Sequence, residues 1–204
     1  MIGTRNTPMY FVGVDLGQAA DYTAISVVEK KDETAQIRHL ERLPLGTPYP
    51  DQVQQVKRIF EALNTPASPV KLIVDHTGVG RAVVDLIKTE GMNPVALTIT
   101  AGNEAIKEGV TWHIPKRDLV SALIVAFQTG KVKISRSLPE ADTLIKELMN
   151  FKLKVNLQTG HDSYEAWREG IHDDLVLSVA MAVYAAELGK PKPVFYIGGV
   201  NRKW

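Results

Sequence analysis

The stretch YFVGVDLG, residues 10–17, is an apolar run that closes on an aspartate, Asp15, and a glycine. A continuous apolar run of this length, bounded by a turn signal, predicts a buried β-strand. Residues 23–28 and 36–43 predict two further strands, and the turns between the three strands are short. The chain is therefore expected to begin with an antiparallel meander.

The rest of the chain alternates between strand and helix patterns. Residues 70–75 are a second apolar run that ends in an aspartate, Asp75, and residues 94–100 predict a fifth strand. Helical patterns occupy residues 51–63, 83–91, 116–127, 139–151 and 171–188. Three antiparallel strands followed by strand–helix–strand units predict an α/β fold, in which two parallel strands complete a mixed sheet and helices cover both faces.

Length and composition favour one globular domain. The 204 residues are 45% hydrophobic, which suits a single domain over residues 1–204, with residues 189–204 as a C-terminal tail and residues 152–160 as a hairpin. The absence of cysteine excludes disulfides, thiolate metal sites and cysteine nucleophiles. The first residues do not resemble a signal peptide, and the longest apolar stretch, residues 175–186, is too short to cross a bilayer. We expect a soluble, intracellular protein that does not bind membranes.

Aspartates occupy three places that such a fold can bring together. Asp15 and Asp75 each close an apolar strand, while Asp173 and Asp174 open the last apolar helix. Taken singly, each is equally well explained as a turn former or a helix N-cap. In the predicted sheet, however, the carboxyl ends of the first and fourth strands can lie side by side. Successive helical residues point about 100° apart, so we expect one of the paired aspartates to face the sheet and the other to cap the helix.

Converging carboxylates repel one another strongly unless cations lie between them. Hard oxygen ligands accompanied by few histidines favour Mg²⁺ or Mn²⁺ over Zn²⁺. Two such ions about 3.5–4 Å apart can activate a water and stabilise the leaving oxygen during phosphodiester cleavage. The same residue types also suit a phosphatase, so this reasoning leaves both activities open.

Three runs of residues, in their order and spacing, resemble the C-terminal nuclease domain of large terminases from tailed phages and prophages. These runs are FVGVDLG at residues 11–17, IVDHTGVG at residues 73–80 and HDDLV at residues 172–176. The resemblance extends roughly from Tyr10 to Leu188. It implies the RNase H-like fold, also called the RuvC-type nuclease fold.

The resemblance also implies an activity, namely two-metal hydrolysis of double-stranded DNA that cuts concatemeric viral genomes during packaging. It assigns catalysis and metal binding to Asp15, Asp75 and Asp173, with Asp174 as a fourth acidic participant and two Mg²⁺ or Mn²⁺ ions as cofactors. The expected location is the cytoplasm of the infected bacterial host. By family analogy the partners are a packaging ATPase domain, a portal and a small terminase subunit. The resemblance assigns no role to His76, His161 or His172.

Large terminases also carry an N-terminal packaging ATPase. The sequence contains no G-x-x-x-x-G-K-[ST] motif, because Gly130-Lys131 is followed by valine and lacks the upstream glycine. We therefore expect either an excised nuclease domain or a stand-alone relative, neither of which would translocate DNA.

Three other interpretations remain open at this point. A RuvC-like resolvase of branched DNA would share the fold and the metals. The VGVDLG run before a hairpin also resembles the first phosphate loop of actin-like ATPases and sugar kinases, although that fold normally needs a second such domain. A non-catalytic DNA- or partner-binding module would leave the clustered carboxylates unexplained, because acids repel a phosphate backbone.

Basic residues near the predicted cleft are candidates for contacts with the DNA backbone. They are Arg81, Lys116, Arg117, Lys131, Lys133, Lys152 and Lys154. The net charge is only +1. We therefore expect the isolated domain to bind DNA weakly and without sequence preference.

Overall fold

The computed structural model describes residues 7–157, apart from residues 79, 103 and 110, together with residues 172–188; the side chains of residues 152–157 and 188 are outside this description. No helix within these ranges is long and apolar enough to span a membrane. The predicted tail, residues 189–204, lies outside the described residues.

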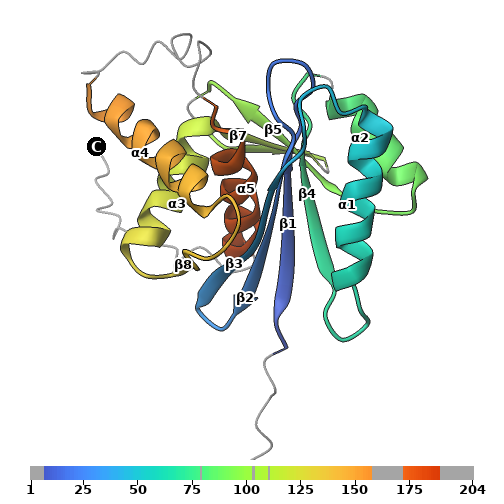
Figure 1. Ribbon diagram of the computed structural model, residues 1–204, viewed down its shortest axis with the longest axis horizontal. Helices are drawn as coiled ribbons and strands as arrows, with labels where there is room; N and C mark the ends of the chain where they lie inside the picture. The colour runs from blue at the N-terminus through green and yellow to red at the C-terminus, as the bar shows by residue number, and fades with distance from the viewer. Residues whose placement is uncertain (1–6, 79, 103, 110, 158–171, 189–204) are drawn as a thin grey trace, which may run out of the picture.

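A mixed sheet of eight strands forms the centre of the molecule, in the order β6-β7-β5-β4-β1-β2-β3-β8 (Figure 1). The first three strands, β1 (Met9–Asp15), β2 (Ala24–Lys31) and β3 (Thr34–Arg42), form an antiparallel meander. On the other side of β1, β4 (Val70–Asp75) and β5 (Val95–Thr100) add parallel strands. The α/β mixed sheet predicted from the sequence is thus confirmed.

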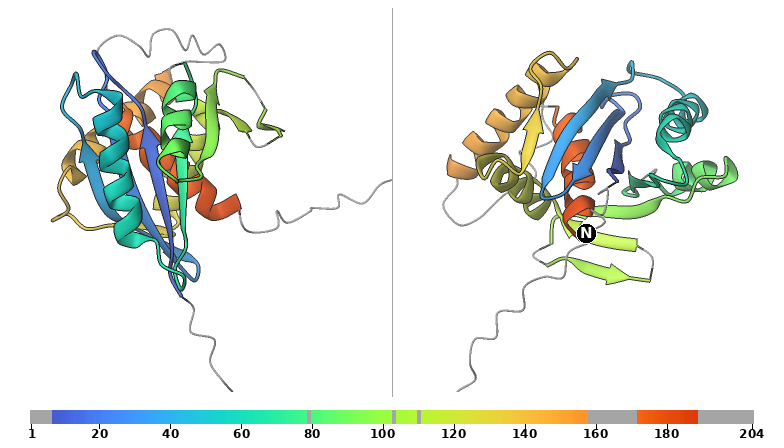
Figure 2. Two further views of the ribbon diagram at one scale, coloured as in Figure 1. Left: turned by 90° about the vertical axis from the view of Figure 1, so that its right-hand side faces the viewer. Right: turned by 90° about the horizontal axis from the view of Figure 1, so that it is seen from below.

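Helices cover both faces of this sheet, as predicted. On one face lie α1 (Tyr49–Leu63) and α2 (Gly80–Thr89), which pack over a core that includes Val12 and Val14. On the other face lie α3 (Lys116–Gln128), α4 (Ala141–Leu157) and α5 (Asp174–Leu188). The view from below in Figure 2 shows the two groups of helices on opposite sides of the strands. The result is a three-layer α/β/α arrangement.

Three short strands were not predicted. A hairpin of β6 (Ile106–Glu108) and β7 (Thr111–Pro115) extends one edge of the sheet beyond β5. At the other edge, β8 (Val132–Ile134) pairs in parallel with β3. Strands of three to five residues carry too little alternation to be recognised from the sequence. The hairpin expected over residues 152–160 is wrong for its first part, since α4 continues through Leu157.

Helix α5 packs directly against β1 at a glycine. The Ser178 hydroxyl donates a buried hydrogen bond of 2.9 Å to the carbonyl oxygen of Gly13. A Cβ added at Gly13 would lie 2.0 Å from the carbonyl oxygen of Ser178. The backbones of helix and strand can approach this closely only because residue 13 has no side chain. This contact sets the position of α5 on the sheet.

We expect Gly13→Ala to lower the free energy of unfolding by about 3 kcal/mol or more, because neither backbone can yield without moving α5. Gly102→Ala is the matched control, since the nearest atom to its added Cβ is the Thr100 hydroxyl oxygen at 3.5 Å. Urea denaturation followed by circular dichroism measures both variants. Equal stability of the two variants would contradict the proposed backbone contact.

Candidate active site

Asp15 and Asp75 lie next to each other at the carboxyl edge of the sheet. Strands β1 and β4 are parallel, and Val14 pairs with Val74, so the register brings the two following aspartates side by side. Alternate residues of a strand share a face, so Asp15 lies on the face of Phe11 and Asp75 on the face of Ile73. Phe11 and Ile73 belong to the core beneath α5, and both aspartates therefore lie on the α5 side of the sheet. The register confirms the expectation that the carboxyl ends of the first and fourth strands lie side by side.

The third acidic element is the start of α5. Asp174 is the first residue of the helix and is 4% exposed. It lies one helical turn before Ser178, the residue that contacts Gly13. Asp15 lies two residues beyond Gly13 on the same face of its strand. The Gly13–Ser178 contact therefore brings Asp174 toward Asp15.

Asp173 precedes the helix and has a different environment. Its carbonyl oxygen accepts the Leu177 N–H at 3.0 Å, which places it at the helix N-terminus, and its carboxylate forms an ion pair of 2.6 Å with Lys116. Of the paired aspartates, Asp174 is thus buried in the first turn of the helix, while Asp173 occupies the position just before it. The ion pair makes Lys116 a partner of Asp173.

The electrostatics of Asp15 show how close these groups lie. Burial raises the pKa of Asp15 well above its usual value, and the negative charges of Asp75, Asp174 and Asp173 raise it further, against the opposite effect of Lys116. Burial likewise raises the pKa of Asp174, to about 6, although nearby His172 opposes the shift. In the absence of a bound cation, burial and the neighbouring charges make ionisation of these carboxylates less favourable than in water.

Asp75 is held by the turn that follows it. One carboxylate oxygen accepts hydrogen bonds from the Thr77 N–H at 2.9 Å and from the Thr77 hydroxyl at 2.6 Å. The same hydroxyl oxygen accepts the Ile99 N–H from β5 at 3.1 Å. Burial raises the pKa of Asp75, while the bonds from Thr77 lower it. The Asp75 side chain therefore has a defined orientation before any ligand binds.

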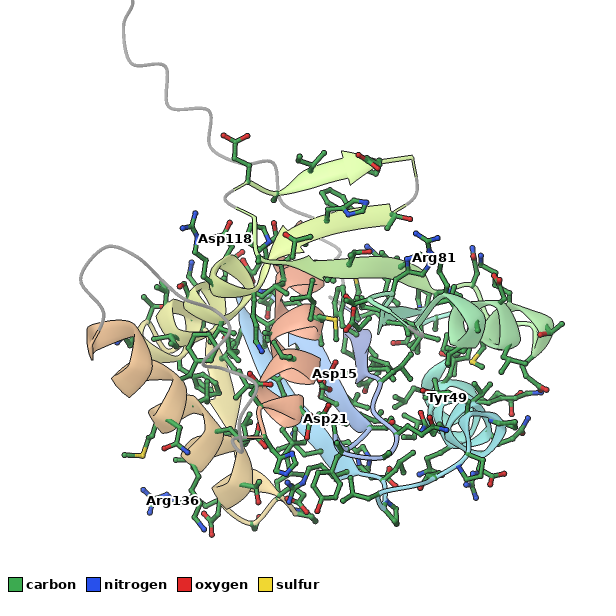
Figure 3. All side chains as sticks on the ribbon, turned by 90° about the horizontal axis from the view of Figure 1, so that it is seen from above. Asp15, Asp21, Tyr49, Arg81, Asp118 and Arg136 are labelled. Carbon is green, nitrogen blue, oxygen red and sulfur yellow. The ribbon has the colours of Figure 1, made fainter. Side chains whose placement is uncertain are left out.

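A second cluster lies beside Asp174. The ligand atoms of Asp21, His172 and Asp174 all lie within 4.8 Å of one another, as expected of groups that can hold a metal ion. The buried oxygen Oδ2 of Asp174 lacks a hydrogen-bond partner within the described residues, and His172 Nδ1 is 3.6 Å away from it. In the view of Figure 3, from above, the labelled residues Asp15 and Asp21 project close to each other. The sequence reasoning missed Asp21 and left His172 without a role.

The loop that carries Asp21 is fastened from the opposite face. Gln52 of α1, which is 1% exposed, donates to the Gly17 carbonyl at 2.9 Å. The Thr23 hydroxyl oxygen accepts the Gly17 N–H at 3.0 Å and lies 2.8 Å from Gln52 Oε1. These bonds join both ends of the loop to α1, so the position of Asp21 depends on the helix layer behind the sheet.

Glu147 of α4 is a buried carboxyl that the sequence did not reveal. Its Oε2 accepts the Val176 N–H in the first turn of α5 at 3.0 Å, while its Oε1 has no hydrogen-bond partner among the described residues. Burial raises its pKa to about 8, and the charges of Asp174 and Asp173 contribute to this rise. Glu147 therefore links α4 to the helix start that presents the paired aspartates.

The predicted DNA-binding residues are spread over the molecule. Arg81 is exposed near the start of α2 and lines a hollow beside the Asp75 turn. Arg117 lies 3.4 Å from Asp118 in an ion pair. Lys131 and Lys133 lie beside Ala35 and Gln36 of β3. Through β2, these two β3 residues align with the amino end of β1, so the lysines lie at the opposite end of the sheet from the carboxylates. Lys152 and Lys154 lie on α4, where their side chains are outside the described residues.

The donor set suits a hard divalent cation. The acidic groups offer carboxylate oxygens, one of them buried without a hydrogen bond, and His172 is the one nitrogen donor in the cluster. Mg²⁺ and Mn²⁺ prefer such oxygen ligands. A bound cation would also offset the repulsion that raises the pKa of Asp15.

The model of the terminase RNase H-like domain family matches residues 12–186. The chain belongs to this family. The match includes all four predicted aspartates and every strand from β2 to β8. The RNase H-like fold that the sequence motifs implied is therefore confirmed.

Proteins similar to this chain include large terminases of a Thermus phage. The large terminase subunit of Thermus phage G20c is 28% identical over 197 residues, which cover 93% of this chain and 36% of that protein. The chain thus spans about a third of that relative's length. A crystal structure of the large terminase nuclease from phage G20c with bound magnesium has a TM-score of 0.59 and 26% identity, covering 88% of this chain and 82% of that one.

A more distant structure shows the same fold. The human cytomegalovirus terminase nuclease domain, soaked with manganese and bound to an inhibitor, has a TM-score of 0.57 at 16% identity. It covers 90% of this chain and 86% of that chain. The arrangement of this terminase domain therefore persists at low sequence identity.

Removal of one charge from the cluster tests its electrostatics. We expect Asp15→Asn to raise the melting temperature of the metal-free domain by a few degrees, because it relieves repulsion within a buried acidic group. The same substitution should abolish the rise in melting temperature that Mg²⁺ or Mn²⁺ produces in the unaltered protein. Differential scanning fluorimetry with EDTA or metal measures both effects. Asp85→Asn, an exposed change on α2, is the control; an Asp15→Asn variant still stabilised by metal would refute the assignment.

The buried carboxyl of Glu147 predicts a pH dependence. Folding raises its pKa from 4.5 to about 8, so the folded state binds this proton more tightly than the unfolded state. The free energy of unfolding should therefore decrease between pH 5 and pH 8 by on the order of 2 kcal/mol more than in Glu147→Gln. Denaturation of both metal-free proteins at several pH values measures the difference. Parallel pH profiles would show that Glu147 does not titrate in this range.

Proposed function

We propose that this domain is a metal-dependent endonuclease that hydrolyses phosphodiester bonds of double-stranded DNA. The observation that carries the proposal is the convergence of Asp15, Asp75 and Asp174 at one edge of the sheet, where burial raises the pKa of each. Isolated ionised carboxylates are costly in such a place. A site that binds divalent cations gives a reason for this arrangement.

The acidic groups divide into two adjoining sets. Asp15 and Asp75 lie side by side on neighbouring strands, while Asp21 and His172 lie close to Asp174. Asp174 adjoins both sets, so we assign it a place between two metal positions, in line with the two ions expected from the sequence. Bound Mg²⁺ or Mn²⁺ would supply an activated water and stabilise the leaving oxygen.

The remaining groups orient these ligands. Thr77 fixes the Asp75 carboxylate, Glu147 fixes the first turn of α5, and Lys116 pairs with Asp173. From the sequence, Asp173 was predicted to take part in catalysis and metal binding. The ion pair suggests instead that Lys116 and Asp173 together orient the helix start, and substitution of Asp173 distinguishes the two roles.

The biological setting follows from the relatives. Their names describe large terminase subunits and terminase nucleases. We infer that this domain cuts concatemeric viral DNA during packaging in the cytoplasm of an infected bacterium. Its partners would be double-stranded DNA, a packaging ATPase domain, a portal and a small terminase subunit. The comparisons favour this role over an actin-like nucleotide-binding protein.

Cleavage of supercoiled plasmid tests the proposal. We expect nicked and linear products with Mg²⁺ or Mn²⁺, none with EDTA, and at least a 100-fold lower rate in Asp75→Asn and Asp174→Asn, because each replaces an anionic carboxylate ligand with a neutral amide. Asp85→Asn should retain full activity, since its side chain is 78% exposed on α2. Comparison of Lys116→Met with Asp173→Asn separates the two roles of Asp173. If Asp173 orients the helix start through its ion pair with Lys116, both variants should lose the same activity. If Asp173 binds the metal directly, Asp173→Asn should lose more.

The outcomes separate the alternatives. Cleavage that survives Asp75→Asn and Asp174→Asn in folded protein would place the active site elsewhere. A strong preference for four-way junctions over linear duplex would indicate a resolvase. Folded protein that binds DNA but does not cleave it with either metal would indicate a binding module.

A further inference from the structure

A polar hollow of about 450 Å³ lies beside the turn that follows Asp75. Its walls come from this turn, from the start of α2 and from the β6–β7 hairpin, with β5 between them. In Figure 3, Arg81 lies between α2 and the strands on the side away from Arg136. Part of the wall is Thr77, the residue that fixes the Asp75 carboxylate. The hollow therefore adjoins the acidic site without being part of it.

The chemistry of the hollow is the opposite of that of the acidic site. The Arg81 side chain lines the hollow and is exposed to solvent. Within the described residues it forms no ion pair with a carboxylate. His76 and His113 supply ring nitrogens and Thr111 supplies a hydroxyl, whereas the Thr77 hydroxyl is already bonded to Asp75 and Ile99. A planar guanidinium beside such polar side chains suits the oxygens of a phosphate.

One acid in the wall opposes anion binding. The carboxylate of Glu108 lies 3.6 Å from Nε2 of His113, and its side chain is 73% exposed. Its charge partly offsets that of Arg81, so the hollow suits one phosphodiester, with a single negative charge, better than a highly charged anion. This opposition also provides a test in which two substitutions have opposite effects.

We propose that the hollow binds a backbone phosphate of the DNA strand, next to the phosphodiester that is cut at the acidic site. The inference rests on the proposed nuclease function and adds a specific contact to it. Each strand of a duplex carries one phosphate about every 3.4 Å of helix axis. Since Thr77 is only two residues beyond Asp75, a strand that reaches Asp75 also brings neighbouring phosphates to the hollow. Contact with phosphate positions the strand and does not select sequence.

The test uses a fluorescein-labelled 30-base-pair duplex, followed by anisotropy with Ca²⁺ in place of Mg²⁺. We expect Arg81→Ala to raise Kd about three- to tenfold and to reduce the slope of log K against log salt concentration by about 1. Glu108→Gln should lower Kd, because it removes the opposing charge. Arg136→Ala removes the same charge from an exposed position on the other side of the molecule and should leave Kd within about twofold.

Cleavage assays complete the test. With Mg²⁺ and saturating duplex, Arg81→Ala should keep the kcat of the unaltered domain while its KM rises, since the hollow positions DNA without contacting the reacting bond. A Kd for Arg81→Ala equal to that of the unaltered domain, or to that of Arg136→Ala, would overturn the inference. Failure of the unaltered domain to cut DNA would instead count against the nuclease function, whereas the binding measurements do not depend on cleavage.

Discussion

The candidate site depends on the close contact between α5 and β1 at Gly13. Because no side chain separates them, the Ser178 hydroxyl reaches the Gly13 carbonyl and the helix lies directly on the strand. Asp174 is one turn before Ser178, and Asp15 is two residues after Gly13. The helical repeat and the strand alternation thus convert one backbone contact into a pair of neighbouring carboxylates.

The arrangement opposes the ordinary preference of buried groups. Asp15 and Asp174 are 7% and 4% exposed, and burial together with repulsion from neighbouring carboxylates raises the pKa of both. Lys116 and His172 offset part of this repulsion. The surrounding core, with an α5 that is apolar almost throughout, stabilises a fold that holds these charges together. Affinity for a divalent cation is the expected consequence, because the cation removes the repulsion that the fold maintains.

Sequence reasoning succeeded where a pattern extends over several residues. Asp15 and Asp75 were found because each ends an apolar strand, and the paired aspartates because they begin an apolar helix. It missed Asp21, which lies in a loop without periodicity, and Glu147, which lies on a helix where glutamate is ordinarily exposed. It also proposed Lys131 and Lys133 as DNA contacts, whereas the register places them at the opposite end of the sheet from the carboxylates.

By itself, the sequence determined the α/β class, the order of the main strands and helices, and the aspartates that end or begin them, because local periodicity and turn residues encode these features. Only the tertiary structure decided which groups meet. The Asp21–His172–Asp174 cluster, the bond from Val176 to Glu147 and the hollow beside Thr77 each join residues far apart in sequence. Their proximity depends on strand order, register and the approach of α5 to Gly13, which no local pattern specifies.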